Sequence, residues 1–264
     1  MAEASHAACE AARFLDRLAR CGQQVEGLPQ ALRPENPAAG YEIQAQLQRL
    51  SAQPLFGWKL AATSKAGQDH IGVDRPLIGR LLAKQQIEDG ASYRALDHNI
   101  MRVAELEFAF RFAEDVEARE APWEPEEALA RVATLHPAIE LPDSRLRRYE
   151  SVGAPQLIAD NACAHFFVLG KASPDEWRKL DLAEQAPWGC IDGQRFRQGS
   201  GRHVLGDPRL ALVWFLNETS RLRLKVRAGE IVSTGTCLQP IPIRHGVTVS
   251  GDFGALGTVA VHIA

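Results

Sequence analysis

Residues 103–112 alternate between apolar and polar positions in the way that a half-buried β-strand requires. Successive side chains of a strand point to opposite faces. Every second residue from Ala104 to Phe112 is apolar, so these side chains define one core face. Glu105 and Glu107 then share the opposite face. The segment therefore predicts a strand that presents two neighbouring carboxylates.

Short apolar runs broken by Gly, Pro and Asp predict further strands after residue 54. These strands cover residues 56–60, 77–82, 138–141, 164–169, 230–234, 247–249 and 258–263. Four segments predict helices instead: residues 5–22, a helix that starts at Asn36-Pro37, residues 125–136 up to Pro137, and a helix from Pro208.

A few helices and many short strands, without a regular βαβ alternation, favour the α+β class. We expect a mixed β-structure with a barrel-like core. Residues 1–54 would form a small helical N-terminal region, and residues 55–264 the mixed-β domain that carries the chemistry. The sequence contains no internal repeat or long linker.

Composition narrows the functional classes. The 264 residues carry a formal net charge of −3, so the overall field does not favour a nucleic-acid partner. The five cysteines form no CxxC pair, which argues against a disulfide framework and a thiolate zinc site and favours the reducing cytoplasm. We expect no signal peptide and no membrane-spanning segment.

The paired carboxylates of Glu105 and Glu107 would repel each other. At about 6–7 Å along a strand, the repulsion costs about 2–3 kcal/mol at an effective dielectric constant near 20. A hard cation such as Mg²⁺ or Mn²⁺ would relieve it. Glu140 ends another apolar run and would complete one side of an octahedral site. Two alternatives stay open: a solvated sheet face for the pair, and a rim position for Glu140 paired with Arg145.

Lys59 interrupts an otherwise apolar strand, and buried lysines are rare unless they are paired. Facing a cluster of carboxylates, this lysine could neutralise a substrate carboxylate or move a proton. It could equally extend from a strand edge into water. Thr63 and Ser64 follow at once and could donate hydrogen bonds, or simply form a turn.

Taken together, the motifs resemble the fumarylacetoacetate hydrolase superfamily, in particular its 2-oxopent-4-enoate hydratases and 4-oxalocrotonate decarboxylases. The resemblance runs from about residue 36 to the C-terminus. The matching motifs are Gly57-Trp58-Lys59, Thr63-Ser64-Lys65, Gly72-Val73-Asp74, Glu105-Leu106-Glu107, Glu140 with Asp143-Ser144-Arg145, Ala159-Asp160-Asn161-Ala162, Gly199-Ser200-Gly201, Val204-Leu205-Gly206-Asp207-Pro208 and Thr234-Gly235.

The resemblance implies a role for each matching site residue. It implies Glu105, Glu107 and Glu140 as ligands of Mg²⁺ or Mn²⁺, Lys59 as the catalytic residue, and Thr63, Ser64, Asp160, Asn161 and Thr234 as residues around the substrate. The substrate would be a small 2-oxo or 2-hydroxy dienoic acid from the degradation of aromatic compounds. The resemblance further implies a homo-oligomer, with association to a neighbouring enzyme of the same pathway as an additional expectation.

Three departures from the family pattern involve four positions. Leu77 stands where many hydratases have an acid/base aspartate, and the decarboxylase branch also carries an apolar residue there. Asp207 replaces the usual histidine, and Arg202-His203 replaces small residues; we expect His203 to be a surface histidine. We expect a hydratase first and a decarboxylase second. An acylpyruvate hydrolase, with His70 as a candidate base, and a partner subunit without turnover remain as further alternatives.

Overall fold

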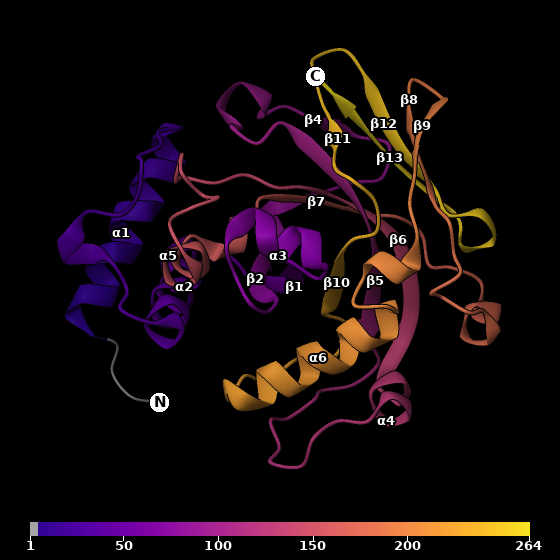
Figure 1. The fold of residues 1–264 in the computed structure, drawn as a ribbon, viewed down its shortest axis with the longest axis horizontal. Helices are drawn as coiled ribbons and strands as arrows, with labels where there is room; N and C mark the ends of the chain where they lie inside the picture. The colour runs from indigo at the N-terminus through magenta and orange to yellow at the C-terminus, as the bar shows by residue number, and fades with distance from the viewer. Residues whose placement is uncertain (1–4) are drawn as a thin grey trace.

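Two β-sheets and a group of helices form the molecule, as a computed structural model of the chain shows (Figure 1). The structure describes residues 5–264. The larger sheet has eight strands, in the order β2-β1-β10-β5-β6-β7-β3, with β11 paired to β5. The smaller sheet has the order β4-β13-β12-β8-β9. Parallel and antiparallel pairs both occur in each sheet.

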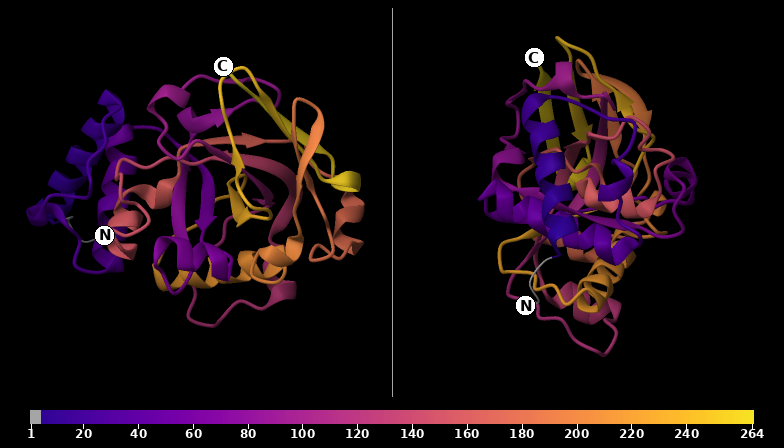
Figure 2. Two further views of the ribbon diagram at one scale, coloured as in Figure 1. Left: turned by 45° about the horizontal axis from the view of Figure 1, so that its top comes forward. Right: turned by 90° about the vertical axis from the view of Figure 1, so that its left-hand side faces the viewer.

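The strands of the larger sheet are β1 Leu55–Ala61, β2 Leu77–Leu82, β3 Gln86–Ile87, β5 Val103–Phe112, β6 Val132–Leu141, β7 Phe166–Leu169, β10 Ile231–Thr236 and β11 Ile241–Pro242. Those of the smaller sheet are β4 Ser92–Tyr93, β8 Trp188–Ile191, β9 Gln194–Gln198, β12 Thr248–Asp252 and β13 Thr258–Ile263. The larger sheet curls into a half-barrel (Figure 2). The predicted α+β class and barrel-like core are therefore confirmed.

Strand β5 lies at the centre of the larger sheet, and its apolar face is buried as the alternation predicts. Each of the five alternating side chains from Ala104 to Phe112 is at most 1 % exposed. Phe108 packs edge-on against Phe253 beside the smaller sheet, with 5.3 Å between ring centroids. Phe112 packs against Phe215 of α6 (Pro208–Arg221) at 6.1 Å. The core face of β5 thus lies under both the smaller sheet and a helix.

The helices begin where the sequence supplies caps. In α1 (His6–Cys21) and α2 (Pro37–Ser51), the side chains of Ser5 and Asn36 accept hydrogen bonds from backbone amides of the first turn. Both helices lie beside α5 (Ala154–Ala159) at one end of the molecule (Figure 1). The domain boundary at residues 54–55 stays a prediction. Across residues 5–264, no helix combines the length and apolar character needed to cross a membrane.

The predicted helix over residues 125–136 is wrong in its second half. Helix α4 covers only Pro125–Ala130, and Val132 already begins β6. The ten-residue strand β5 requires a partner along its whole length, and β6 supplies it, with Phe110 opposite Leu135 and Phe112 opposite Val132. Sheet pairing and burial therefore override the local helical pattern.

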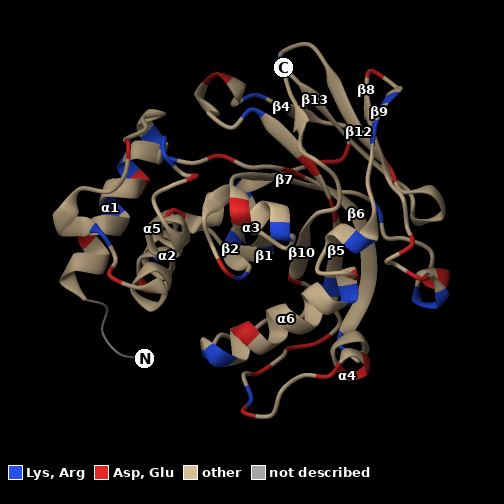
Figure 3. Ribbon diagram, viewed as in Figure 1, with Lys and Arg blue, Asp and Glu red and all other residues tan. Residues whose placement is uncertain are grey.

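Acidic and basic residues are distributed along many of the helices, strands and loops (Figure 3). Arg145, the partner of Glu140 in the alternative left open above, is largely buried and pairs with Asp160 at 2.5 Å. It does not pair with Glu140, so that alternative for Glu140 is wrong. Its neighbours Arg147 and Arg148 are exposed.

Candidate metal centre and its cavity

Strand register brings the three predicted carboxylates together. Glu105 of β5 lies directly opposite Glu140 of β6, and Glu107 lies two residues further along the same face of β5. One carboxylate oxygen from each residue lies within 4.8 Å of the other two. The three acidic residues, which come from two separate segments, therefore converge on one point.

Two of the three carboxylates are fully buried, Glu105 is partly buried, and the cluster is incompletely hydrogen-bonded. Glu107 and Glu140 are 0 % exposed. One oxygen of Glu107 accepts bonds from the Ser233 hydroxyl and, at 3.1 Å, from the Gly235 amide. The other Glu107 oxygen and both Glu140 oxygens accept no hydrogen bond. Buried polar atoms without a partner are costly, and a hard cation prefers such oxygens as ligands. The donor set therefore fits a divalent ion such as Mg²⁺ or Mn²⁺.

Burial dominates the electrostatics of this cluster. Burial and, after it, the neighbouring Glu140 raise the pKa of Glu105 to about 7, while Lys59 opposes the shift. Burial, then Glu140 and Glu105, hold the pKa of Glu107 well above its usual range. The pKa of Glu140 is also raised by burial, against the effect of Lys59. Without a cation, the folded protein therefore retains protons on carboxyl groups that would ionise in water.

Lys59 lies on the same face of the sheet and is 2 % exposed. Its Nζ is 3.1 Å from Glu140 Oε1 and donates a hydrogen bond to the carbonyl oxygen of Ala162 at 2.9 Å. The Glu140 contact is an ion pair whose angles fall outside hydrogen-bond geometry, which is why that oxygen still lacks a bonded donor. Burial opposes the charge on Lys59, but Glu140 and Glu105 outweigh it and raise the pKa of the lysine. Lys59 is a buried, paired cation, so the alternative of an edge lysine in water is wrong.

A cavity of about 630 Å³ opens beside the cluster. The wall contains four of the predicted site residues: Lys59, Glu105, Thr63 and Ser64. It also contains Leu77, which differs from the family pattern. Much of the remaining wall is apolar, with contributions from Ala61, Ile71, Met101, Pro142, Leu157, Leu238 and Pro240. The volume falls in the range of small-molecule sites. The candidate centre is therefore reachable by a small organic ligand.

The hydroxyl residues predicted around the substrate have different surroundings. Thr63 is buried in the cavity wall, and Ser64 caps α3 (Lys65–Ile71) by accepting a bond from the Gly67 amide at 3.0 Å. Thr234 is fully buried and donates to the Phe108 carbonyl at 3.0 Å. Within the described chain, Thr234 is not among the residues that line the cavity.

Asp160 and Asn161 also lie outside the cavity lining, among residues 5–264. Asp160 accepts bonds from the Ser144 hydroxyl at 2.7 Å and the Arg145 amide at 3.0 Å. The Asn161 side chain bonds to the backbone of Arg80. Direct contact of either residue with a substrate stays a prediction; the geometry shows them holding the wall behind Lys59.

Sequence reasoning missed Ser233, Tyr149 and the Ala162 carbonyl. Ser233 lies opposite Lys59 in the parallel pair of β1 and β10 and bonds to Glu107. Tyr149 and Met101 lie in the cavity wall. No local pattern marks these positions, although the predicted strand over residues 230–234 contains Ser233. His203 is exposed, as expected, yet it also borders the cavity.

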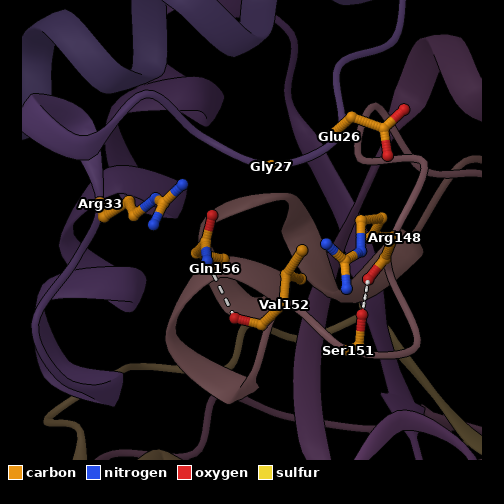
Figure 4. Close-up of a pocket in the computed structure, with 7 residues that line it drawn as sticks. All are labelled: Glu26, Gly27, Arg33, Arg148, Ser151, Val152 and Gln156. Carbon is orange, nitrogen blue, oxygen red and sulfur yellow. Dashed lines mark hydrogen bonds between the residues drawn. The ribbon is translucent and has the colours of Figure 1, made fainter.

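A second cavity, of about 310 Å³, lies between residues 26–33 and the segment leading into α5 (Figure 4). Two of its polar side chains have partners in the chain: Arg33 Nε donates to the Leu28 carbonyl at 2.7 Å, and Gln156 Nε2 to the Val152 carbonyl at 2.9 Å. No metal-binding cluster occurs there among the described residues. The chemistry is therefore concentrated at the carboxylate cluster.

Comparison with known proteins identifies the family. Residues 87–264 match the fumarylacetoacetate hydrolase C-terminal family. A 2-keto-4-pentenoate hydratase of Burkholderia vietnamiensis is 30% identical over 218 residues, covering 83% of this chain and 81% of the relative. The chain therefore belongs to the fumarylacetoacetate hydrolase family, and the predicted resemblance is confirmed.

Two further relatives place the chain within the family. A 4-oxalocrotonate decarboxylase of a Pseudomonas species is 29% identical over 206 residues, covering 77% of each protein. The solved 4-oxalocrotonate decarboxylase from Pseudomonas putida G7, described as complexed with magnesium and adipate, superimposes with a TM-score of 0.87 over 97% of both chains, at 20% identity. The latter likeness shows that the two proteins share the fold along almost their whole length.

Protons should compete with a divalent cation for the cluster. Because the pKa of Glu105 is about 7 in the cation-free protein, binding below that pH must displace a proton. We expect Mn²⁺ at fixed concentration to raise the unfolding temperature more at pH 8 than at pH 6. Thermal unfolding with and without Mn²⁺ measures the difference. Equal shifts at both values would mean that the ion binds away from these carboxylates.

Proposed function

We propose that the protein is a divalent-cation-dependent hydro-lyase. It would add water across the diene of a 2-hydroxyalka-2,4-dienoate and release a 4-hydroxy-2-oxo acid. The observation that carries the proposal is the convergence of Glu105, Glu107 and Glu140 beside Lys59 in the wall of a small-molecule cavity. Curated relatives with a hydratase name support the reaction class. The surplus of unpaired carboxylate oxygens supports the cation.

A bound Mg²⁺ or Mn²⁺ would act as a Lewis acid towards the substrate's carboxylate and 2-oxygen. Residues of the chain would supply charge stabilisation, proton exchange and substrate orientation. Lys59 has three ammonium protons; the ammonium donates a hydrogen bond to the Ala162 carbonyl and forms an ion pair with Glu140. The third is free to stabilise negative charge on the substrate or to exchange a proton, directly or through water. Thr63 and Ser64 would orient the carboxylate end by hydrogen bonds.

The cavity wall beyond Lys59 favours hydration of a monocarboxylate over decarboxylation of a dicarboxylate. In the β1–β2 pair, Ala61 lies opposite Leu77, two residues from the Lys59–Gly79 pair and on the same face. Leu157 and Met101 also line the cavity. Among the lining residues that the structure describes, Lys59 is the one Lys or Arg. A second substrate carboxylate would therefore lie against apolar side chains without a fixed cation.

One observation favours the decarboxylase as a second candidate. Leu77 lines the cavity at the position where many hydratases of the family carry an acid/base aspartate, and leucine cannot move a proton. Under hydration, Lys59 or a water molecule held by it would have to supply the proton. Both reactions would use the same carboxylate cluster, so the cluster does not separate them.

An activity panel tests the proposal. With Mn²⁺ present, we expect kcat/KM for 2-hydroxypenta-2,4-dienoate to exceed that for 4-oxalocrotonate by about 10–100-fold, the effect of leaving a charged group unpaired in an apolar site. Loss of dienoate absorbance without CO₂ release would identify hydration. Metal-dependent CO₂ release from 4-oxalocrotonate as the faster reaction would instead establish the decarboxylase.

Leu77→Lys gives the panel an internal check. Placing a cation in the apolar wall should improve the relative kcat/KM for the dicarboxylate, whereas the neutral, size-matched Leu77→Met should leave the preference unchanged.

Cleavage of an acylpyruvate carbon–carbon bond would point to the hydrolase alternative. Cation binding without turnover of any of these compounds would point to the partner subunit. A cytoplasmic location, a homo-oligomeric state and association with a pathway enzyme remain part of the proposal.

A further inference from the structure

The segment that faces Lys59 has an unusual backbone. Asn161, Ala162 and Cys163 have φ values of +58°, +50° and +61°. This is the left-handed region, which residues with a Cβ rarely adopt because the Cβ approaches the following carbonyl oxygen. Three consecutive non-glycine residues persist in it only if their surroundings determine the conformation. The contacts of this turn with the rest of the chain must therefore stabilise its strained conformation.

Two side chains hold the turn in place. The Arg80 amide donates to Asn161 Oδ1 at 2.8 Å, and Asn161 Nδ2 donates back to the Arg80 carbonyl at 2.9 Å. On the other flank, the Asp160 carboxylate is 0 % exposed and bonds to Ser144 and Arg145. The turn is thus tied to β2 through one amide side chain and to the end of β6 through one carboxylate.

The carbonyl groups of the turn each have a defined partner. The carbonyl of Asn161 accepts from the Ala164 amide at 3.0 Å, and that of Cys163 from the Asp143 amide at 3.0 Å. The carbonyl of Ala162 is the one directed at a side chain of the site, since it accepts from Lys59 Nζ at 2.9 Å. The left-handed turn therefore supplies one of the two fixed contacts of the lysine ammonium.

The facing strand leaves room for this arrangement. Gly79 lies opposite Lys59 in the β1–β2 pair. A Cβ at position 79 would lie 2.6 Å from the Asn161 carbonyl oxygen and 3.0 Å from Lys59 Cγ. Any other residue would push the turn and the lysine apart. Gly79 of β2 and the turn at residues 161–163 thus allow β2, the turn and Lys59 to approach one another closely.

We infer that Asn161 is a positioning residue: its side-chain amide fixes the left-handed turn so that the Ala162 carbonyl holds Lys59 Nζ between itself and Glu140. The inference rests on the proposed role of Lys59 in turnover. Asn161 touches neither the carboxylate cluster nor the cavity in the described chain, so its effect passes through Lys59. The lysine would keep its third proton aimed at the substrate only while the turn is in place.

The test compares Asn161→Ala with a matched control, Asn217→Ala. Asn217 of α6 makes the same kind of reciprocal bond to one residue's backbone, with Oδ1 accepting from the Trp123 amide and Nδ2 donating to the Trp123 carbonyl. For Asn161→Ala we expect kcat to fall about 10–100-fold, as misplacement of a reacting group by about 1 Å can cause. The Mn²⁺ dissociation constant, measured by electron paramagnetic resonance, should change by less than about threefold, because the carboxylates are untouched. The control should keep kcat within about twofold.

Several outcomes would overturn the inference. One is an Asn161→Ala enzyme with unchanged kcat. Another is loss of kcat in both variants in proportion to their loss of thermal stability, which would make the role purely structural. If Asn161→Ala does not fold, Asn161→Gly replaces it, because glycine adopts the left-handed conformation without a steric penalty. The same fall in kcat is expected there, and full activity of Asn161→Gly would show that the side-chain bonds are not required.

A structural readout separates this inference from the proposed function. If the wild-type protein turns over no dienoate, the proposed function fails, but crystal structures of the wild type and of Asn161→Ala or Asn161→Gly still decide the positioning role. We expect Lys59 Nζ in the variant to lie more than about 3.5 Å from the Ala162 carbonyl oxygen, beyond hydrogen-bond distance. A contact retained at the wild-type distance would contradict the inference whatever the activity.

Discussion

Glu107→Gln is expected to abolish most turnover and, at the same time, to stabilise the cation-free protein. The substitution keeps the shape of the side chain but removes one carboxylate ligand. Losing several kcal/mol of Lewis-acid stabilisation corresponds to a fall in kcat/KM of at least about 10³-fold. Steady-state kinetics with saturating Mn²⁺ measures this loss, and Mn²⁺ titration should show a matching loss of affinity.

The stability change of the same variant has the opposite sign. Burial and two neighbouring carboxylates raise the pKa of Glu107 in the folded protein. The folded state therefore holds a proton that the unfolded state releases, and wild-type stability falls as the pH rises from about 4 towards that raised pKa. Glutamine has no such dependence. The variant should therefore gain about 1–2 kcal/mol at pH 8, the usual sign when a buried charge is replaced by a neutral group.

Glu117→Gln is the control, because Glu117 is an exposed residue that pairs with Lys225. It should leave kcat/KM and Mn²⁺ affinity unchanged. Full activity in Glu107→Gln would show that the ligand assignment is wrong. Lost activity with lower stability in the cation-free protein would show that Glu107 serves the fold rather than a cation.

Lys59→Met is expected to have the second-largest effect, with a different signature. The substitution removes the ammonium that faces Glu140 at 3.1 Å and leaves the buried carboxylates without a cation. Breaking a buried pair in this way costs about 3–5 kcal/mol. Turnover should fall at least about 10²-fold, the contribution of a positioned proton donor. Mn²⁺ affinity should be retained or increased, because a neighbouring positive charge is gone.

The instability of Lys59→Met should depend on pH. Without the lysine, the raised carboxyl pKa values rise further, so the folded state binds more protons than the unfolded state over a wider range. The free energy of unfolding should therefore fall as the pH rises from about 5 to 8. Urea unfolding at both pH values measures it. The control is Lys225→Met, which removes a partly exposed pair and should cost less than about 1 kcal/mol. A stable, active Lys59→Met enzyme would refute the proposed role.

The central strand and its two carboxylates were predictable because they follow from alternation within one segment. Glu105 and Glu107 are neighbours on any strand that buries Phe108 and Phe110. Their approach to Glu140 depends on β6 lying beside β5 in one register, which a sequence pattern does not encode. Glu140 was a candidate because it ends an apolar run, the resemblance to a known family favoured it as the third ligand, and the structure shows the convergence.

Two features could not be read from the sequence because tertiary contacts decide them. Residues 132–136 follow a helical pattern but lie in β6, which pairs with one edge of β5 along its outer half while β10 pairs with the other edge. The left-handed turn at residues 161–163 contains no glycine. Its conformation depends on Asn161 bonding to β2, which lies 81 residues earlier in the chain. Local propensity carries no information about either contact.

Coordination of a single divalent ion by three carboxylates from two strands underlies the proposed function. Crystals grown with Mn²⁺ and measured at the manganese absorption edge test it most directly. We expect one anomalous peak within about 2.0–2.4 Å of an oxygen from each of Glu105, Glu107 and Glu140, the range for hard cations on oxygen ligands. A peak elsewhere, or no peak at Mn²⁺ concentrations that support turnover, would contradict it.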